Sequence, residues 1–208
     1  MVYSYYLNDI LSDTEGLLSA LPFYFTGAVV AWLLTYLGHA IGCSLFKVKG
    51  ADFGVSYNPI KNLSFYSVLG VLALPLLGVG WTKPTKYDSE QRSKSFGVAF
   101  SGPLFCFVVS WLFIFVYKFT TLPFLGSLTM GIATAGICFS IMNVLPLPGF
   151  CGGVMVASIL PEKASSVWAR ILEFYPLTVT LAVLLIKRSQ VNSLVIEKAM
   201  EFLGNIIS

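Results

Sequence analysis

Charged residues are scarce in this 208-residue chain, at 11% of the composition, whereas a soluble domain carries roughly 25%. Hydrophobic residues make up 56% and aromatic residues 15%. A chain so poor in charge lacks the polar side chains that a water-facing surface needs. The composition therefore excludes a soluble domain and predicts a polytopic integral membrane protein embedded in a lipid bilayer, with many of the aromatic side chains at the two bilayer interfaces.

Other features that the sequence lacks exclude further classes. The net charge is only +3 and the basic residues lie in short loops, so no basic face is available for nucleic acid. The first sixteen residues lack the basic start of a signal peptide, and we expect no cleaved leader. The first four expected spans contain a single ionisable residue of the kind that transport sites use, His39, which disfavours a transporter.

About 20 apolar residues are needed to cross the hydrocarbon core of a bilayer. We expect a polar N-terminal segment over residues 1–16, a transmembrane domain over 17–188 and an amphipathic helix over 189–208 that lies on the membrane surface or on a partner. The predicted fold class is all-α: a polytopic bundle of about 5–6 membrane segments, some kinked or re-entrant. The expected spans are residues 17–46, 63–81, 95–117, 124–145 and 167–186, and residues 50–62 are expected to form a loop or a short hairpin.

One segment, residues 143–153, cannot be a plain helix although its surroundings are apolar. It contains two prolines, Pro146 and Pro148, and three glycines. Irregular backbone at membrane depth persists only where it is buried in protein or lines a cavity. The pattern therefore indicates a site in this region.

His39 is the only histidine in the chain, and Cys43 follows four residues later on the same helix face. Cys151 lies in the irregular segment. Histidine and two thiolates form a ligand set that suits zinc, and such a set is catalytic when water holds the fourth position. The alternative reading is that His39 bonds a neighbouring carbonyl while the cysteines pack as small hydrophobes.

The cysteines leave two further alternatives open. Cys106 or Cys138 would close a structural zinc site by supplying a fourth ligand. Cys43 and Cys151 would form a disulfide if their Cα atoms lie within about 7 Å. All four cysteines lie in or beside apolar segments, which is not the pattern of a secreted disulfide framework.

Four motifs in order resemble the site-two protease family of intramembrane zinc metalloproteases, in its compact bacterial type without a PDZ domain. That family has H-E-x-x-H on a membrane helix, where this chain has residues 39–43. Its G-W-A-K-P loop, A-G-P-L motif and N-x-L-P-x-P-x-x-D-G-G motif match residues 80–84, 101–104 and 143–153. The matching structural residues are Gly80, Trp81, Pro84, Gly102, Pro103, Asn143, Pro146, Gly152 and Gly153.

The departures from the family fall on its chemistry. Its general-base glutamate corresponds to Ala40, its second histidine ligand to Cys43 and its aspartate ligand to Cys151, so that only His39 is retained. Loss of the base removes about 10²–10⁴-fold in rate. The resemblance implies a catalytically inactive protein that acts as a scaffold or as the subunit of a membrane complex that binds a transmembrane helix, with no cofactor.

The alternative is a divergent intramembrane zinc metalloprotease that uses His39, Cys43 and Cys151 as ligands. The resemblance places the protein in a bacterial inner membrane, with an organellar inner membrane as the alternative. Its partners are then the bilayer and other membrane proteins.

Overall fold

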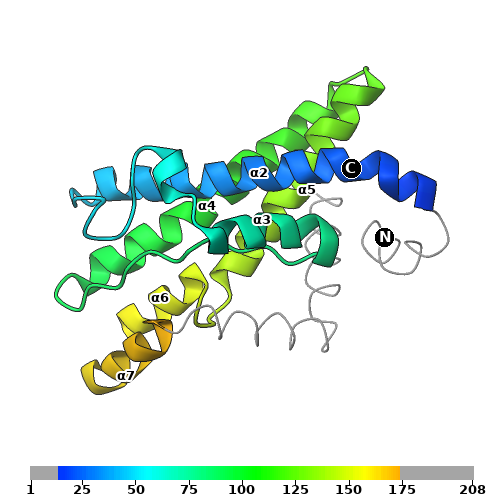
Figure 1. Cartoon of the computed structure of the whole chain (residues 1–208). Helices are drawn as coiled ribbons and strands as arrows, with labels where there is room; N and C mark the ends of the chain where they lie inside the picture. Colours follow the sequence, from blue (N-terminus) through cyan, green and yellow to red (C-terminus); the bar gives the residue numbers. More distant parts are fainter. Residues whose placement is uncertain (1–13, 174–208) are drawn as a thin grey trace.

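The computed structural model describes residues 14–173, and within that range all regular structure is helical (Figure 1). The predictions for residues 1–13, for the amphipathic helix over 189–208 and for most of the span over 167–186 concern residues outside this range. The elements are α2 (Thr14–Leu45), the 3₁₀ helix η1 (Pro59–Asn62), α3 (Phe65–Leu77), α4 (Arg92–Lys118), α5 (Pro123–Val144), α6 (Cys151–Ile159) and α7 (Glu162–Glu173).

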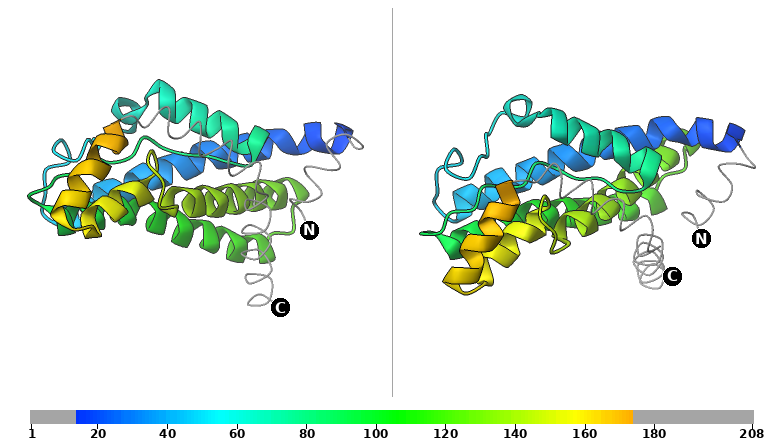
Figure 2. Two further views of the ribbon diagram at one scale, coloured as in Figure 1. Left: turned by 90° about the horizontal axis from the view of Figure 1, so that it is seen from below. Right: turned by 60° about the horizontal axis from the view of Figure 1, so that its bottom comes forward.

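Three of these helices are long and apolar enough to cross a membrane: α2 from Ala20 to Leu45, α4 and α5. This confirms the prediction of a helical membrane protein. The three helices pack on one another (Figure 2), and small residues allow the close approach that membrane helices use. A Cβ on Gly27 of α2 would lie only 2.4 Å from the carbonyl oxygen of Gly131 on α5.

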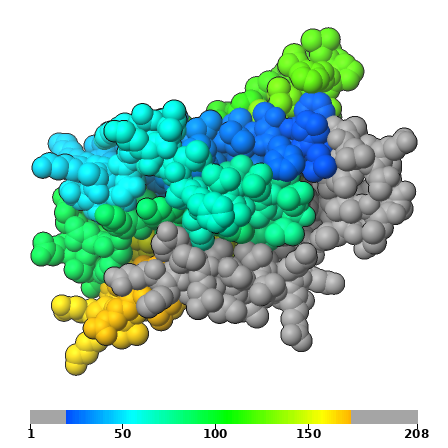
Figure 3. Space-filling model, viewed as in Figure 1, coloured from blue at the N-terminus to red at the C-terminus, as the bar shows by residue number. Residues whose placement is uncertain are grey.

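The span expected over residues 63–81 is corrected by α3, which has only 13 residues. At 1.5 Å per residue it is about 20 Å long, well short of the ~30 Å hydrocarbon core. Gly78 ends it in the left-handed conformation with φ of 70°, which a glycine adopts without steric cost. The helix lies on the outside of α2, where Figure 3 shows it at the surface of the molecule.

Extended chain follows α3 and returns towards α4, so this part of the sequence does not cross the bundle as a single helix. Residues 79–82 of the extended chain are buried, as irregular backbone at membrane depth must be. Residues 50–62, expected to form a loop or a short hairpin, form a loop of turns that ends in η1. In α4, the helix continues through Pro103 without a break.

The irregular segment after α5 leads into α6, and α7 then packs against α6. Polar contacts hold α7 in place: Trp168 Nε1 donates to the Gly153 carbonyl at 2.9 Å, and Ser165 Oγ donates to the Ala157 carbonyl at 2.8 Å. The Tyr87 hydroxyl on the extended chain lies 2.5 Å from the same Ser165 oxygen. Helix α7 is therefore bonded both to α6, which contains Cys151, and to the extended chain.

The basic residues within residues 14–173 are distributed unequally between the two ends of the bundle. Lys118, at the end of α4, stands alone at the end where α2 begins. The remaining lysines and arginines of this range lie between the end of α2 and the start of α4, in the first turn of α4 and in α7.

Candidate functional site

His39 lies inside the bundle, on α2, with no exposed surface. Its Nδ1 is 2.7 Å from the carbonyl oxygen of Val98 on α4. A carbonyl only accepts hydrogen bonds, so Nδ1 carries the proton and Nε2 keeps its lone pair. The ring is therefore fixed in one orientation and one tautomer by the backbone of a neighbouring helix.

Gly102 on α4 provides the space in which the His39 ring lies. A Cβ at this position would lie 2.3–2.6 Å from three ring atoms of His39, closer than any real side-chain contact. Gly102 belongs to the motif at residues 101–104, and in the structure this motif packs closely against the His39 ring. Pro103, the next residue, is also buried.

Cys151 is the residue that meets His39. It is the first residue of α6, is fully buried, and its Sγ lies 3.6 Å from His39 Nε2. Since Nε2 accepts, the thiol is the donor in this contact. Cys151 lies outside the three long helices, and burial raises the pKa of its thiol to about 12, an effect that the hydrogen bond with Thr82 partly opposes.

Asn143 joins three parts of the site. Its Oδ1 accepts from the backbone nitrogen of Thr82 at 3.3 Å, and its Nδ2 donates to the Phe139 carbonyl at 2.7 Å. Thr82 Oγ1 in turn lies 4.0 Å from Cys151 Sγ. The asparagine predicted as a structural motif residue thus holds the extended chain against α5, beside the two side chains that meet.

The remaining glycines of the predicted motifs allow backbone and rings to approach closely. A Cβ on Gly152 would lie 2.2 Å from the Val144 and Leu145 carbonyl oxygens, and one on Gly153 would lie 2.5 Å from the Leu147 oxygen. The irregular segment therefore folds back directly onto the start of α6, which places Cys151 opposite α2.

The extended chain uses its glycine and tryptophan in the same way. A Cβ on Gly80 would meet the Phe139 ring at 2.7 Å. Trp81 is buried in an apolar cluster with Met142 and Phe150. Pro84 follows in the extended chain, and Pro146 lines an apolar groove between α4 and α5.

Cys43, the third predicted ligand, belongs to a different cluster. It packs with Ala40, Phe53, Val55 and Val98, rather than beside Cys151. Ala40 is 6% exposed in the same cluster, so the position that corresponds to a general base contributes a methyl group to apolar packing.

The other two cysteines lie farther along the bundle. Cys106 and Cys138 share an apolar cluster with Trp32 and Phe139, and Cys106 Sγ lies 3.5 Å from the Ala31 and Gly136 carbonyl oxygens. None of the four cysteines forms a disulfide, and this includes the Cys43–Cys151 pair.

The fit of a zinc ion can be judged from these contacts. Two tetrahedral zinc ligands with Zn–N near 2.0 Å and Zn–S near 2.3 Å lie about 3.5 Å apart, and His39 Nε2 and Cys151 Sγ are 3.6 Å apart. A zinc site needs at least three protein ligands, however, and residues 14–173 hold no group of three or more His, Cys, Asp or Glu side chains placed to bind a metal. The described residues therefore supply one ligand pair and do not form a complete zinc centre.

Two residues of the site were not singled out from the sequence, Val98 and Thr82. Val98 acts through its backbone carbonyl, which no side-chain pattern reveals. Thr82 lies inside the predicted loop motif, between Trp81 and Lys83, and its position there was the available signal.

Comparisons of this chain with protein-family models, with curated proteins and with solved structures find no match. The role of the site is therefore inferred from its own geometry and from the sequence motifs.

Proposed function

We propose that this protein is a catalytically inactive, site-two-protease-like integral membrane protein that acts as a scaffold or helix-binding subunit of a membrane complex. The observation that carries the proposal is the packing of Ala40. Its methyl group lies among Cys43, Phe53, Val55 and Val98, where a hydrolase of this kind would need a carboxylate to take a proton from water.

The contacts of His39 support the same proposal. Nδ1 is bound to a backbone carbonyl, Nε2 faces the Cys151 thiol, and the ring lies against Gly102. Buried polar groups that are satisfied in this way stabilise a unique packing of helices. In this role the histidine joins α2, α4 and α6, and the family's site becomes a structural contact.

An apolar groove of about 380 Å³ between α4 and α5 is the surface where we place a partner's transmembrane helix. Phe100, Leu104 and Phe107 of α4 line one side, and Ile141 and Val144 of α5 line the other. All five side chains are apolar, so the groove suits a hydrophobic helix within the bilayer.

The test is site-specific photo-crosslinking in native membranes. A photoreactive residue at Phe107, in the groove, is expected to capture a membrane protein, whereas the matched control at Leu112, which is 50% exposed elsewhere on α4, is not. The captured protein should also co-purify with the full chain in mild detergent. Recovery of the chain as a lone monomer, with no product at Phe107, would contradict the proposal.

A second candidate function, a divergent intramembrane zinc metalloprotease, is favoured by one observation. The 3.6 Å between His39 Nε2 and Cys151 Sγ is close to the spacing of about 3.5 Å between two zinc ligands. Metal content of the purified full chain separates the two candidates. About one zinc per chain, lost in His39→Ala and accompanied by chelator-sensitive cleavage of membrane peptides, would favour the protease. A chain that purifies without metal would favour the scaffold function over the protease.

A further inference from the structure

Helix α7 lies at the end of the bundle where α2 ends and α4 begins. Arg92, the first residue of α4, donates through Nη2 to the carbonyl of Leu160, two residues before α7 begins. Arg92 and Lys94 make the first turn of α4 charged, and charged side chains near helix ends stay at the edge of the hydrocarbon core. In both views of Figure 2, α7 (orange) runs obliquely across the direction of the three long helices. Helix α7 therefore lies at the level of the lipid headgroups.

One side of α7 packs against the protein. Ser165 and Leu172 are buried, and Trp168, between them, donates from Nε1 to the Gly153 carbonyl of α6 at 2.9 Å. These three positions are three and four residues apart, the spacing that puts side chains on one helix face. The contacts of this face fix the rotation of α7 about its own axis and so determine which of its residues face outward.

A second side of α7 is apolar and exposed. Ala164, Val167 and Ile171, which we call the apolar stripe, have the same spacing as the packed side, shifted by one residue. Val167 is 61% exposed and Ile171 is 37% exposed. The described part of the chain therefore leaves the apolar stripe largely uncovered, at the depth where the bilayer begins.

Charged residues are placed around α7 in a definite order. Lys163 and Arg170 are exposed and lie four and three residues from Val167, so both border the apolar stripe. Glu162 is nine residues before Ile171, or about two and a half turns, which places it on the opposite side of the helix. The order around the helix is therefore apolar, basic and acidic. An interfacial helix has this order, because its apolar side chains enter the bilayer while its basic side chains extend to the lipid phosphates.

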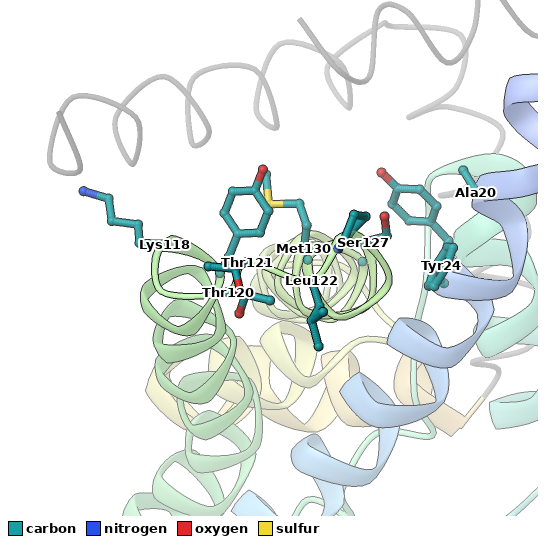
Figure 4. A pocket seen from close by; sticks show the side chains of 13 residues that line it. Ala20, Tyr24, Lys118, Thr120, Thr121, Leu122, Ser127 and Met130 are labelled. Atoms are coloured by element: carbon teal, nitrogen blue, oxygen red, sulfur yellow. The ribbon is translucent and has the colours of Figure 1, made fainter.

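The opposite end of the bundle has no such helix among residues 14–173. There α2, α4 and α5 line a cavity of about 860 Å³, and Tyr24, Thr121 and Ser127 lie around it (Figure 4). The interfacial arrangement is thus confined to the end that carries most of the basic residues within this range.

We propose that α7 is an interfacial helix whose apolar stripe lies in the bilayer, at the boundary between the headgroups and the acyl chains. Lys163 and Arg170 contact the lipid phosphates, and Glu162 faces water. The bond from Trp168 to Gly153, two residues from Cys151, then holds α6 at a fixed depth in the membrane. The proposal concerns contact with lipid and is independent of the proposed scaffold function.

Site-directed spin labelling of the full chain in liposomes of phosphatidylcholine and phosphatidylglycerol tests this. The label is attached to Val167→Cys or Ile171→Cys, and Ser166→Cys, an exposed position outside the apolar stripe, is the matched control. The four native cysteines are buried, so the label reacts with the introduced thiol. We expect oxygen, which concentrates among the acyl chains, to relax the labels at Val167 and Ile171 more than a water-soluble nickel chelate does. The reverse is expected at Ser166.

Two results would overturn the proposal. Stronger relaxation by the chelate at both Val167 and Ile171 would mean that the apolar stripe faces water. Weak relaxation by both reagents at these positions would mean that protein, rather than lipid, covers it.

The double change Lys163→Gln/Arg170→Gln tests the role of the two cations. Each cation at an anionic membrane surface contributes roughly fivefold to binding, so the ratio of oxygen to chelate relaxation at Val167 should fall in this variant. An unchanged ratio would overturn the contact of these residues with phosphate. Both residues are exposed, and an unchanged circular dichroism spectrum ensures that the variant is folded.

Discussion

Replacing Gly102 by alanine tests the packing on which the candidate site depends. The new methyl group would lie 2.3 Å from His39 Cε1, 2.5 Å from Nε2 and 2.6 Å from Nδ1. Carbon atoms reach their optimal contact at about 3.5–4.0 Å, so the ring must move. It cannot move without loss, because Val98 binds Nδ1 on one side and Cys151 lies against Nε2.

The expected cost follows from overpacking, which typically destabilises a core by about 1–3 kcal/mol. Alanine also gains about 1 kcal/mol over glycine inside a helix, and this gain must be removed from the comparison. Gly126→Ala on α5 is the matched control, because its Cβ meets only the edge of the Tyr117 ring, at 3.4 Å. For a chain of this size, a difference of 1–3 kcal/mol corresponds to an apparent Tm roughly 2–12 °C lower in Gly102→Ala than in Gly126→Ala.

The assay is thermal unfolding of the full chain in detergent, at one scan rate, with a dye that becomes fluorescent on reaction with thiols. All four cysteines are buried and none forms a disulfide, so the dye reports unfolding directly. The double variant His39→Ala/Gly102→Ala has no ring for the new methyl group to meet. We expect it to unfold at a higher temperature than the sum of the two single changes predicts, with a coupling of about 1–3 kcal/mol. Equal Tm values for Gly102→Ala and Gly126→Ala, or strict additivity in the double variant, would refute the packing described here.

Three further predictions concern the same region and its orientation in the membrane. Ala40→Glu should lower the apparent Tm by roughly 6–20 °C, because an unpaired carboxylate in an apolar cluster costs about 3–5 kcal/mol; an unchanged Tm, or a gain of proteolysis, would contradict the packing of this residue. Cys151 should resist maleimide in the folded chain at both pH 7 and pH 9, because its pKa of about 12 keeps the thiol protonated at both and it is fully buried; mass spectrometry should detect its adduct only after unfolding. Most basic residues lie at the end of the bundle where α2 ends and α4 begins, so the positive-inside rule places this end on the cytoplasmic or matrix side. An impermeant maleimide should therefore label Lys61→Cys from that side and Thr121→Cys from the other side. Labelling of both from one side would refute this orientation.

The sequence alone determined the class of the protein and most of its long helices. A chain with so little charge and with long apolar runs is stable only in a bilayer. Helices α2, α4 and α5 begin and end within a few residues of the expected spans. The glycines of the motifs were also evident, because residues without a side chain are needed wherever helices or rings approach closely. The pairing of His39 with Cys151 was anticipated as part of a ligand set, first from ligand chemistry and the irregular backbone around Cys151 and then from the resemblance.

Tertiary structure decided the length of α3 and the composition of the site. Hydropathy sums side chains without regard to backbone conformation, so it could not show that Gly78 ends α3 early and sends the chain back as an extended segment. Helix periodicity placed His39 and Cys43 on one face of α2. Two side chains on one helix face can nevertheless pack against different parts of the protein. Packing directs His39 towards Cys151 and Cys43 towards Phe53 and Val55, because α4 and the fold of the irregular segment, which are distant in sequence, determine what each side chain meets.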